Sequence, residues 1–522
     1  MPQLSVANRT LSRIPKRAEK QEIEVLHRTF SDSGVFDVID TVDSQIIYGR
    51  RGTGKTHALN YLASEKRESG ELAVYLDLRT VGSPTGVTGG PPADRAERAT
   101  RLLIDILGAL HEELLSSALE GATTGDELLV ARANAFAQAI ARVRVEGTVS
   151  RGRTSRQSTS SGSNFAAELS GGFHGGRVTA ATIAGETSSN EHREEVNGVE
   201  THEIHFGEVS RALRDLTESL ATKRLWILID EWSSLPPELQ PFLAEFLLRS
   251  VLPLKKIVVK IAAIEHQSVF RTTSGDATIG FEVGADISAN VNLDDFMVYE
   301  GNEERSVEFF SDLFTRHVAA GEGLVPGIDT SVPSSVITVA FSDSRAFAEL
   351  VRAAEGVPRD ALNIAGIAAT HALDTKITVP LVRQAARDWY QSDKLKALES
   401  RQEAIRLLHW IIDEVIRGKK ARAFLVTEDE SHSPEILTLF DARVLHLVRR
   451  GYSAQDDPGV RYNIWNIDFG AYVDLIRTKN APQGALAIGN DDSTFATVDV
   501  PAEDRRAIRR AILTLKDFAS PR

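Results

Sequence analysis

The sequence of 522 residues contains no cysteine. Disulfide bonds, thiolate metal sites and cysteine nucleophiles are therefore excluded. Long apolar runs are also lacking, since none approaches the ~20 residues that span a bilayer. The longest candidate, Ile257–Ile264, is interrupted by Lys260, and the N-terminal segment has no apolar core typical of a signal peptide. These absences lead us to expect a cytoplasmic protein without a membrane partner.

Positive charge is scarce as well. Lysine and arginine number 60 against 73 aspartate and glutamate residues, which gives a net charge of −13. This balance argues against a protein coated in nucleic acid, although a local basic surface stays open. With 42% hydrophobic and 25% charged residues the composition is that of a globular protein. A chain of this length exceeds a single core and suggests about three or four domains.

What the sequence does contain is a glycine-rich loop in the stretch Gln45–Thr56, QIIYGRRGTGKT. The short run Gln45–Tyr48, with its two isoleucines, predicts a buried strand, and the loop after it matches G-x-x-x-x-G-K-[ST]. The segment after the loop predicts a helix whose apolar face is formed by Ala58, Leu59, Leu62 and Ala63. A chance match in a glycine turn is the alternative, and the strand and helix on either side argue against it.

The order strand, loop and helix predicts phosphate binding. Backbone N–H groups of such a loop point at phosphate oxygens, and the helix N-terminus adds partial positive charge. We expect Lys55 to reach the β- and γ-phosphates of ATP and Thr56 to hold Mg²⁺. The expected nucleotide-binding residues are Gly49, Arg50, Arg51, Gly52, Thr53, Gly54, Lys55 and Thr56.

A second acidic motif follows the fully apolar stretch Leu225–Ile229, which predicts a buried parallel strand. It ends in Asp230 and Glu231, where side chains point into the crevice at which ligands of such sheets bind. We expect Asp230 to hold Mg²⁺ through water and Glu231 to act as the general base for the attacking water.

Three more strands are predicted, at Leu72–Leu78, Leu254–Ile264 and Ala289–Leu293. The second of them ends at Glu265–His266–Gln267. His266 or Gln267 suits a position near a γ-phosphate, because Glu265 would repel it; the alternative is an ordinary role at a strand end. Arg271 lies where an arginine finger acting in trans could be found, but an exposed surface arginine is the commoner explanation.

Residues 301–398 have the periodicity of a small helical domain. Within GVPRD, Gly356 closes one helix and Pro358 begins the next, so that Arg359 lies in a first helical turn. Cations are disfavoured there, which favours a ligand role such as contact with the γ-phosphate. The alternative is a surface helix start.

The segment 143–205 is rich in Ser and Gly and predicts a β-hairpin-like arm after two helices at Asp94–Leu119 and Asp126–Arg142. An arm that touches DNA or RNA and a flexible solvated insertion are the two interpretations. The second is favoured because no aromatic residues are interleaved with its arginines. Those arginines are Arg142, Arg144, Arg151, Arg153 and Arg156.

Residues 401–478 follow the order helix, strand, helices and hairpin, which is typical of a winged helix. Its possible DNA-reading helix, Leu437–Arg450, has few cationic candidates, and the charges over 401–480 cancel to zero. Because DNA affinity depends largely on phosphate neutralisation, this unit suits a protein partner at least as well. The cationic candidates are Arg443, His446, Arg449 and Arg450.

Taken together, GRRGTGKT, LWILIDE, GVPRD and the winged-helix order resemble the AAA+ ATPases, in particular bacterial members similar to the origin-recognition-complex type, with the signal-transduction (STAND) NTPases as near relatives. The resemblance covers about 20–478 except 120–205. It implies an α/β fold: a P-loop, three-layer parallel-sheet AAA+ core with a helical lid and a C-terminal winged-helix domain. The implied parts are the core (44–300, with the 143–205 insertion), the lid (301–398) and the winged helix (401–478). Outside them, apolar periodicity predicts an N-terminal helical segment (1–43, with a helix at Ala18–Phe30) and a tail (479–522) with a helix near Ala502–Phe518.

The resemblance also implies roles. Lys55 and Thr56 would bind phosphate and Mg²⁺, Asp230 and Glu231 would be the metal and base residues, and Arg359 would be the second sensor. The usual Asn, Ser or Thr of the first sensor is replaced by the neighbourhood of His266, and no arginine finger is assigned.

We therefore expect a slow ATPase that couples Mg²⁺-ATP to movement of the lid and winged helix. Its output is either a protein partner, which the negative net charge favours, or DNA, which the basic insertion favours. A nucleotide-binding scaffold with negligible hydrolysis is the third hypothesis, and self-association into a homo-oligomer is a further expectation to test.

Overall fold

A computed structural model describes residues 5–81, 95–121, 127–140, 143–146, 199–202, 204–219, 224–274, 277–296, 303–321, 325–329, 331–453, 459–475 and 511–519. The chain divides into two compact units. One comprises residues 1–40, 47–62 and 291–522, and the other comprises residues 41–46 and 63–290. Within the described ranges, no helix is long and apolar enough to cross a membrane.

The five predicted strands form one sheet, in the order β2-β5-β6-β1-β9. The pairs β2–β5 and β5–β6 are parallel, with Leu72 opposite Leu225 and Asp77 opposite Asp230. Every residue of β5 and β6 is buried, as expected for a parallel sheet covered by helices. The predicted α/β class with a parallel sheet is confirmed. The strands are β1 (Gln45–Tyr48), β2 (Leu72–Asp77), β5 (Leu225–Asp230), β6 (Ile257–Ala263) and β9 (Ser288–Asn292).

Lys260, which interrupts the longest apolar run, is fully buried within β6. Its ammonium donates hydrogen bonds to the backbone oxygen of Asp43 (2.8 Å), the hydroxyl of Thr41 (3.3 Å) and the side chain of Gln45. The lysine therefore ties β6 to the segment that leads into β1, and its charge is satisfied by oxygen atoms.

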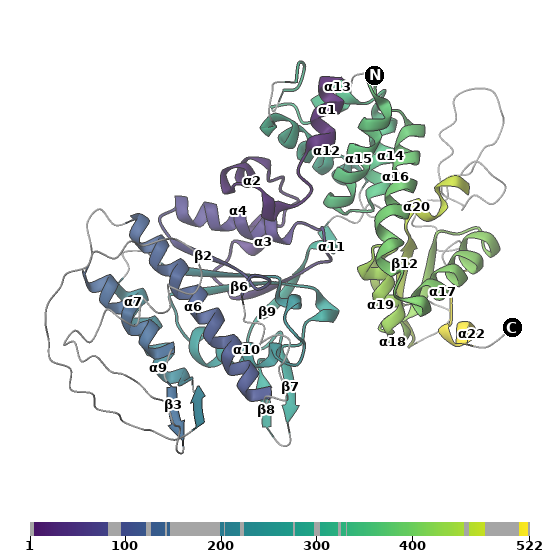
Figure 1. The fold of residues 1–522 in the computed structure, drawn as a ribbon. Coiled ribbons are helices and arrows are strands. Elements are labelled where there is room, and N and C mark those ends of the chain that lie inside the picture. The colour runs from purple at the N-terminus through teal and green to yellow at the C-terminus, as the bar shows by residue number, and fades with distance from the viewer. Residues whose placement is uncertain are drawn as a thin grey trace, which may run out of the picture. The chain divides into compact units, whose positions relative to one another are not determined.

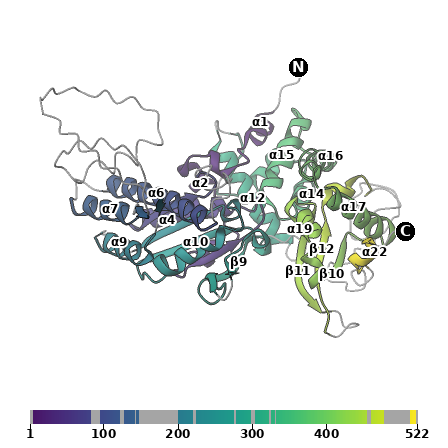
Figure 2. The same ribbon diagram turned by 60° about the horizontal axis from the view of Figure 1, so that its bottom comes forward.

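The unit of residues 41–46 and 63–290 surrounds its strands with helices. One apolar face of α6 is buried, formed by Leu103, Ile106, Leu107, Leu110 and Leu114. α7 and α9 pack side by side (Figure 2). The helices and helical turns are α6 (Arg95–Gly121), α7 (Glu127–Ile140), α9 (Phe206–Ser219), η2 (Trp232–Ser234), α10 (Gln240–Phe246), η3 (Leu247–Val251) and η4 (Glu265–Gln267).

Two small antiparallel pairs belong to this unit. β3 (Val143–Glu146) pairs with β4 (Val199–His202), at the two ends of the predicted arm. The rest of the arm, with Arg151, Arg153 and Arg156, and also Arg142, lies outside the described residues. The hairpin β7 (Arg271–Ser274) and β8 (Ala277–Gly280) was not predicted.

The other unit contains the helices that flank the glycine-rich loop and the helical region after it. The helices α14, α15 and α16 pack against one another (Figure 1). The helices and turns, in chain order, are α1 (Val6–Arg13), η1 (Ala18–Lys20), α2 (Ile23–Thr29), α3 (Phe36–Ile39), α4 (Lys55–Glu68), α11 (Leu293–Phe296), α12 (Glu303–Ala320), α13 (Ser335–Ala340), α14 (Ser344–Ala354), α15 (Pro358–Ala372), α16 (Val379–Trp389), η6 (Tyr390–Lys394) and η7 (Lys396–Leu398).

The predicted single helix Ala18–Phe30 is wrong in its first half. Gln21 and Glu22 have extended backbone conformations, which separate the turn η1 from α2. Leu26 of α2 is buried, whereas Ile23 at its start is 46% exposed.

A three-stranded antiparallel sheet, in the order β10-β12-β11, follows in the same unit. α17 packs against α19, and α19 packs against β11 (Figure 2). The elements are α17 (Gln402–Ile411), η8 (Ile412–Gly418), β10 (Ala423–Thr427), α18 (Glu428–Ser431), α19 (Pro434–Asp441), β11 (Leu445–Ser453), β12 (Arg461–Ile467), α20 (Phe469–Tyr472), η9 (Val473–Leu475) and α22 (Leu515–Ala519).

Two helix predictions fail in this region. The expected DNA-reading helix Leu437–Arg450 ends at Asp441, because Arg443 adopts a left-handed φ of 59° and Leu445 begins β11. The expected terminal helix Ala502–Phe518 is limited to α22 in the described part. Just before it, the backbone of Ala511 and Leu513 hydrogen-bonds to Leu425 of β10.

Candidate functional site

The glycine-rich loop connects β1 to α4, as predicted. Gly52 and Gly54 have φ angles of 93° and 98°, which favour glycine, and Gly49 leaves no space for a side chain. A Cβ atom on Gly49 would lie 2.6 Å from the hydroxyl of Thr53 and 3.2 Å from the Cβ of Leu293. The motif glycines are therefore required by the backbone path of this loop.

Lys55 begins α4 and folds its side chain back over the loop. Its Nζ donates to the carbonyl oxygens of Gly49 (2.7 Å) and Arg50 (2.9 Å). Thr53 also donates its hydroxyl to the carbonyl of Arg50, at 2.9 Å. The ammonium therefore lies against the backbone of the loop at the N-terminus of α4, an arrangement that attracts an anion. Thr56, the next residue of α4, is half-buried.

Arg359 lies beside this loop. Pro358 is the first residue of α15, as predicted, and the backbone N–H of Arg359 donates to the carbonyl oxygen of Gly52 at 3.2 Å. Its guanidinium is partly buried, burial lowers its pKa, and its Nε has no hydrogen-bond partner among the described residues. An unsatisfied guanidinium nitrogen next to a phosphate-type loop is a candidate for contact with an anionic ligand.

We expect Gly52→Ala to damage the loop more than an ordinary glycine replacement. The new Cβ would lie 2.9 Å from the Cβ of Arg359, in addition to the strain of the positive φ. The control is Gly70→Ala, which has a φ of 77° and open space around the new Cβ. Thermal unfolding should therefore show a larger loss for Gly52→Ala, by about 1–2 kcal/mol. Equal losses would contradict close contact between Arg359 and the loop.

Asp230 is the last residue of β5 and is fully buried. One carboxylate oxygen accepts the hydroxyl of Tyr75 at 2.7 Å, and the other accepts the backbone N–H of Glu231 at 2.8 Å. Burial, and after it the charge of Asp230, raises the pKa of Tyr75, which therefore acts as a donor. Such a fixed, hard oxygen donor suits Mg²⁺ held through water. Tyr75, two residues before the end of β2, was not among the residues predicted from the sequence.

Glu231 has a left-handed backbone, with φ 56° and ψ 38°. Non-glycine residues adopt this conformation rarely, and functional sites are where such strain is concentrated. Its carboxylate accepts the hydroxyl of Ser234 at 3.1 Å and forms an ion pair with Arg79 at 3.6 Å. Arg79, which also pairs with Asp77, is a second residue that the sequence analysis did not identify.

The remaining sequence candidates lie at and after the end of β6. Glu265, His266 and Gln267 form the turn η4 directly after β6, with Glu265 exposed and His266 and Gln267 half-buried. Arg271 begins β7, is half-exposed, and pairs with Glu282 at 2.8 Å. The ion pair with Glu282 agrees with the ordinary surface role given above as the alternative for Arg271.

Arg50 and Arg51 differ sharply although they are neighbours. Arg51 is exposed, whereas Arg50 is only 4% exposed. The backbone N–H and the Nε of Arg50 donate to the two carboxylate oxygens of Asp294, at 2.8 and 2.7 Å. Arg50 therefore anchors the loop instead of extending to a ligand.

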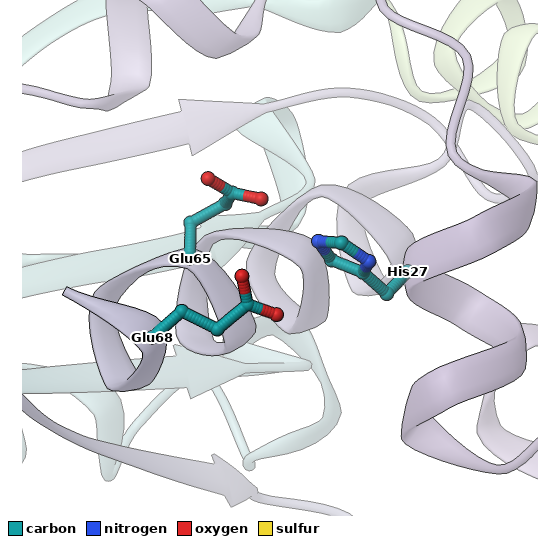
Figure 3. Close-up of side chains that lie close together, drawn as sticks. All are labelled: His27, Glu65 and Glu68. Carbon is teal, nitrogen blue, oxygen red and sulfur yellow. The ribbon is translucent and has the colours of Figure 1, made fainter.

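Aromatic rings cover α4 on the side of the preceding segment. Tyr61 stacks on Phe30, with ring centroids 4.0 Å apart, and on His27 of α2, with centroids 4.9 Å apart. Figure 3 shows His27 together with Glu65 and Glu68, which project from the end of α4. The rings fix α2 against α4 within their unit.

Comparison of the chain with known protein families and with curated proteins finds no match.

Proposed function

We propose that this protein binds Mg²⁺-ATP and hydrolyses it slowly, as an AAA+-like switch. The observation that carries the proposal is the position of Lys55, whose ammonium is held above the glycine-rich loop by two of its carbonyl oxygens. The start of α15 is hydrogen-bonded to the same loop, which supports Arg359 as a residue that senses the γ-phosphate.

In this proposal each residue has one task. The loop N–H groups and Lys55 bind the β- and γ-phosphates, and Arg359 contacts the terminal phosphate. Thr56 and Asp230 would hold Mg²⁺, which would supply charge neutralisation on the phosphates. Glu231 takes the proton of the attacking water, and its carboxylate forms an ion pair with Arg79 at 3.6 Å.

The test is Glu231→Gln, which keeps the size of the side chain but removes the base. We expect phosphate release to fall about a hundredfold, while Mg²⁺-ATP binding stays at the parental level. Binding is measured by titration and turnover by phosphate release, on the full chain. Equal turnover of parent and variant would favour the nucleotide-binding scaffold without catalysis.

We further propose that α12 to α16 act as the lid and that the sheet β10-β12-β11 with α17 and α19 acts as a winged helix. For the output, a protein partner remains the first candidate because the net charge is −13. DNA is the second, supported by three exposed arginines on the hairpin β11–β12: Arg449, Arg450 and Arg461. Turnover that rises with duplex DNA and falls steeply with salt would favour DNA.

A further inference from the structure

Buried polar side chains link the glycine-rich loop to the C-terminal sheet, and the proposed chemistry does not use them. Arg50 donates from its Nη1 to the backbone oxygen of Leu445 (3.1 Å) and contacts the Nδ1 of His446 at 3.3 Å. Its guanidinium also lies 4.3 Å from the ring centre of Phe440. Three contacts from one side chain thus reach α19 and β11.

His446 must be neutral for these contacts to exist. A guanidinium can only donate, so Nδ1 of His446 is the acceptor and the proton is on Nε2. That Nε2 lies 3.0 Å from a carboxylate oxygen of Asp468, which accepts it. Burial, against the pull of Asp468 and with the help of Arg50, lowers the pKa of His446 to about 4. The contacts of the two ring nitrogens therefore fix the tautomer of His446.

The connection continues beyond Asp468. Lys394, 1% exposed, pairs with Asp468 and also with Asp360, the latter at 2.9 Å. Asp360 follows Arg359 in the first turn of α15 and is bound by Arg443 at 3.1 Å. These contacts form a buried relay that starts at the loop and reaches Asp360, the neighbour of Arg359, whose N–H donates to Gly52. The members of the relay are Arg50, His446, Asp468, Lys394, Asp360 and Arg443.

The geometry of Arg50 determines where Lys55 is held. The carbonyl oxygen of Arg50 accepts from Lys55 at 2.9 Å, while its N–H and side chain are fixed by Asp294 and His446. The neighbouring Gly52 and Gly54 adopt positive φ angles, which glycine tolerates without steric cost. Fixing one peptide of such a loop prepares it for a ligand and lowers the entropic cost of binding.

We propose that Arg50 is a positioning residue and that His446 holds it, so that the C-terminal sheet and the nucleotide site influence each other. This inference depends on the proposed nucleotide binding. Coupling between two sites is reciprocal. A sheet β10-β12-β11 that holds Arg50 strengthens ATP binding, and bound ATP in turn stabilises the sheet against local opening.

The test compares three variants of the full chain by Mg²⁺-ATP titration. His446→Phe removes the acceptor for Arg50 and should weaken binding about tenfold. His446→Gln keeps an acceptor and a donor and should bind within about twofold of the parent. The control is Asn463→Ala, which breaks a buried hydrogen bond to Gly451 in the same sheet but does not contact Arg50; its binding should be parental.

Hydrogen exchange supplies a second measurement that a merely structural role would not change. Mg²⁺-ATP should slow exchange of the amides of Leu445 to Leu447 in the parent and in His446→Gln, but not in His446→Phe. If the parent binds Mg²⁺-ATP and His446→Phe binds equally well with the same protection, the positioning role is overturned while nucleotide binding stands. If the parent binds no Mg²⁺-ATP, the proposed function itself fails and this inference with it.

Discussion

Lys55→Met is expected to lower ATP turnover about a thousandfold, because one charged donor at the transferred phosphate is lost. The methionine fills a similar volume but cannot donate to the carbonyl oxygens of Gly49 and Arg50, which Lys55 contacts at 2.7 and 2.9 Å. Binding of Mg²⁺-ATP should weaken as well, since the ammonium contacts phosphate already in the ground state. Turnover and titration of the full chain measure the two effects.

The matched control is Lys66→Met in the same helix, α4. Lys66 carries the same charge, but its Nζ lies 4.7 Å from the ring centre of Trp226, away from the loop. We expect turnover of this variant to remain at the parental level. Parental turnover in Lys55→Met would instead exclude the loop as the site of phosphoryl transfer.

The loop and the sheet could be predicted because their causes are local. The strand Gln45–Tyr48, the glycines and the helix after them are adjacent in sequence, so spacing alone indicates the turn. The buried strand at Leu225–Asp230 is equally predictable, since every residue before Asp230 is apolar. Tyr75 was not predicted because its hydrogen bond to Asp230 depends on the pairing of β2 with β5, which no single segment encodes.

The boundaries of the C-terminal elements were harder to predict. The apolar content of Leu445–Arg450 is compatible with a helix. The stretch belongs to a strand instead, because Arg443 before it turns the chain with a left-handed φ. Arg443 and His446, counted as cations for DNA, are both buried. The partner of Arg443, Asp360, is 83 positions away, and the partner of His446, Asp468, is 22 positions away. The sequence pattern alone therefore could not distinguish a solvated charge from a buried pair.

The same distance in sequence explains why the anchoring role of Arg50 was not predicted. Arg50 and Asp294 are separated by 244 positions, and Arg50 and His446 by 396. An arginine inside a phosphate loop suggests contact with phosphate when only its neighbours are known. The two arginines of the motif, Arg50 and Arg51, are adjacent in the sequence and have opposite exposure, which only tertiary packing decides.

Lys394→Met is expected to destabilise its unit by about 3–5 kcal/mol, the cost of removing one partner from a buried ion pair. Lys394 is 1% exposed and is shared by Asp360 and Asp468, both buried. Without the ammonium, two carboxylates lose a common counter-charge in a site of low dielectric. Chemical unfolding of the full chain measures the effect. Lys396→Met, an exposed lysine two positions later, is the control and should leave the midpoint unchanged.

The pH dependence of Lys394→Met distinguishes a lost charge pair from a packing defect. Burial alone would raise the pKa of Asp360, but Lys394 and Arg443 lower it to about 2. Because the folded-state pKa is depressed, the stabilisation is present above the unfolded pKa near ~3.9 and is lost as pH falls through about 2. In the variant the carboxyl loses its main counter-charge, so protonation relieves the repulsion at higher pH. The difference in unfolding free energy between parent and variant should therefore narrow from pH 7 toward pH 3. A difference that stays constant would mean that Lys394 contributes through packing of its alkyl chain and not through its charge.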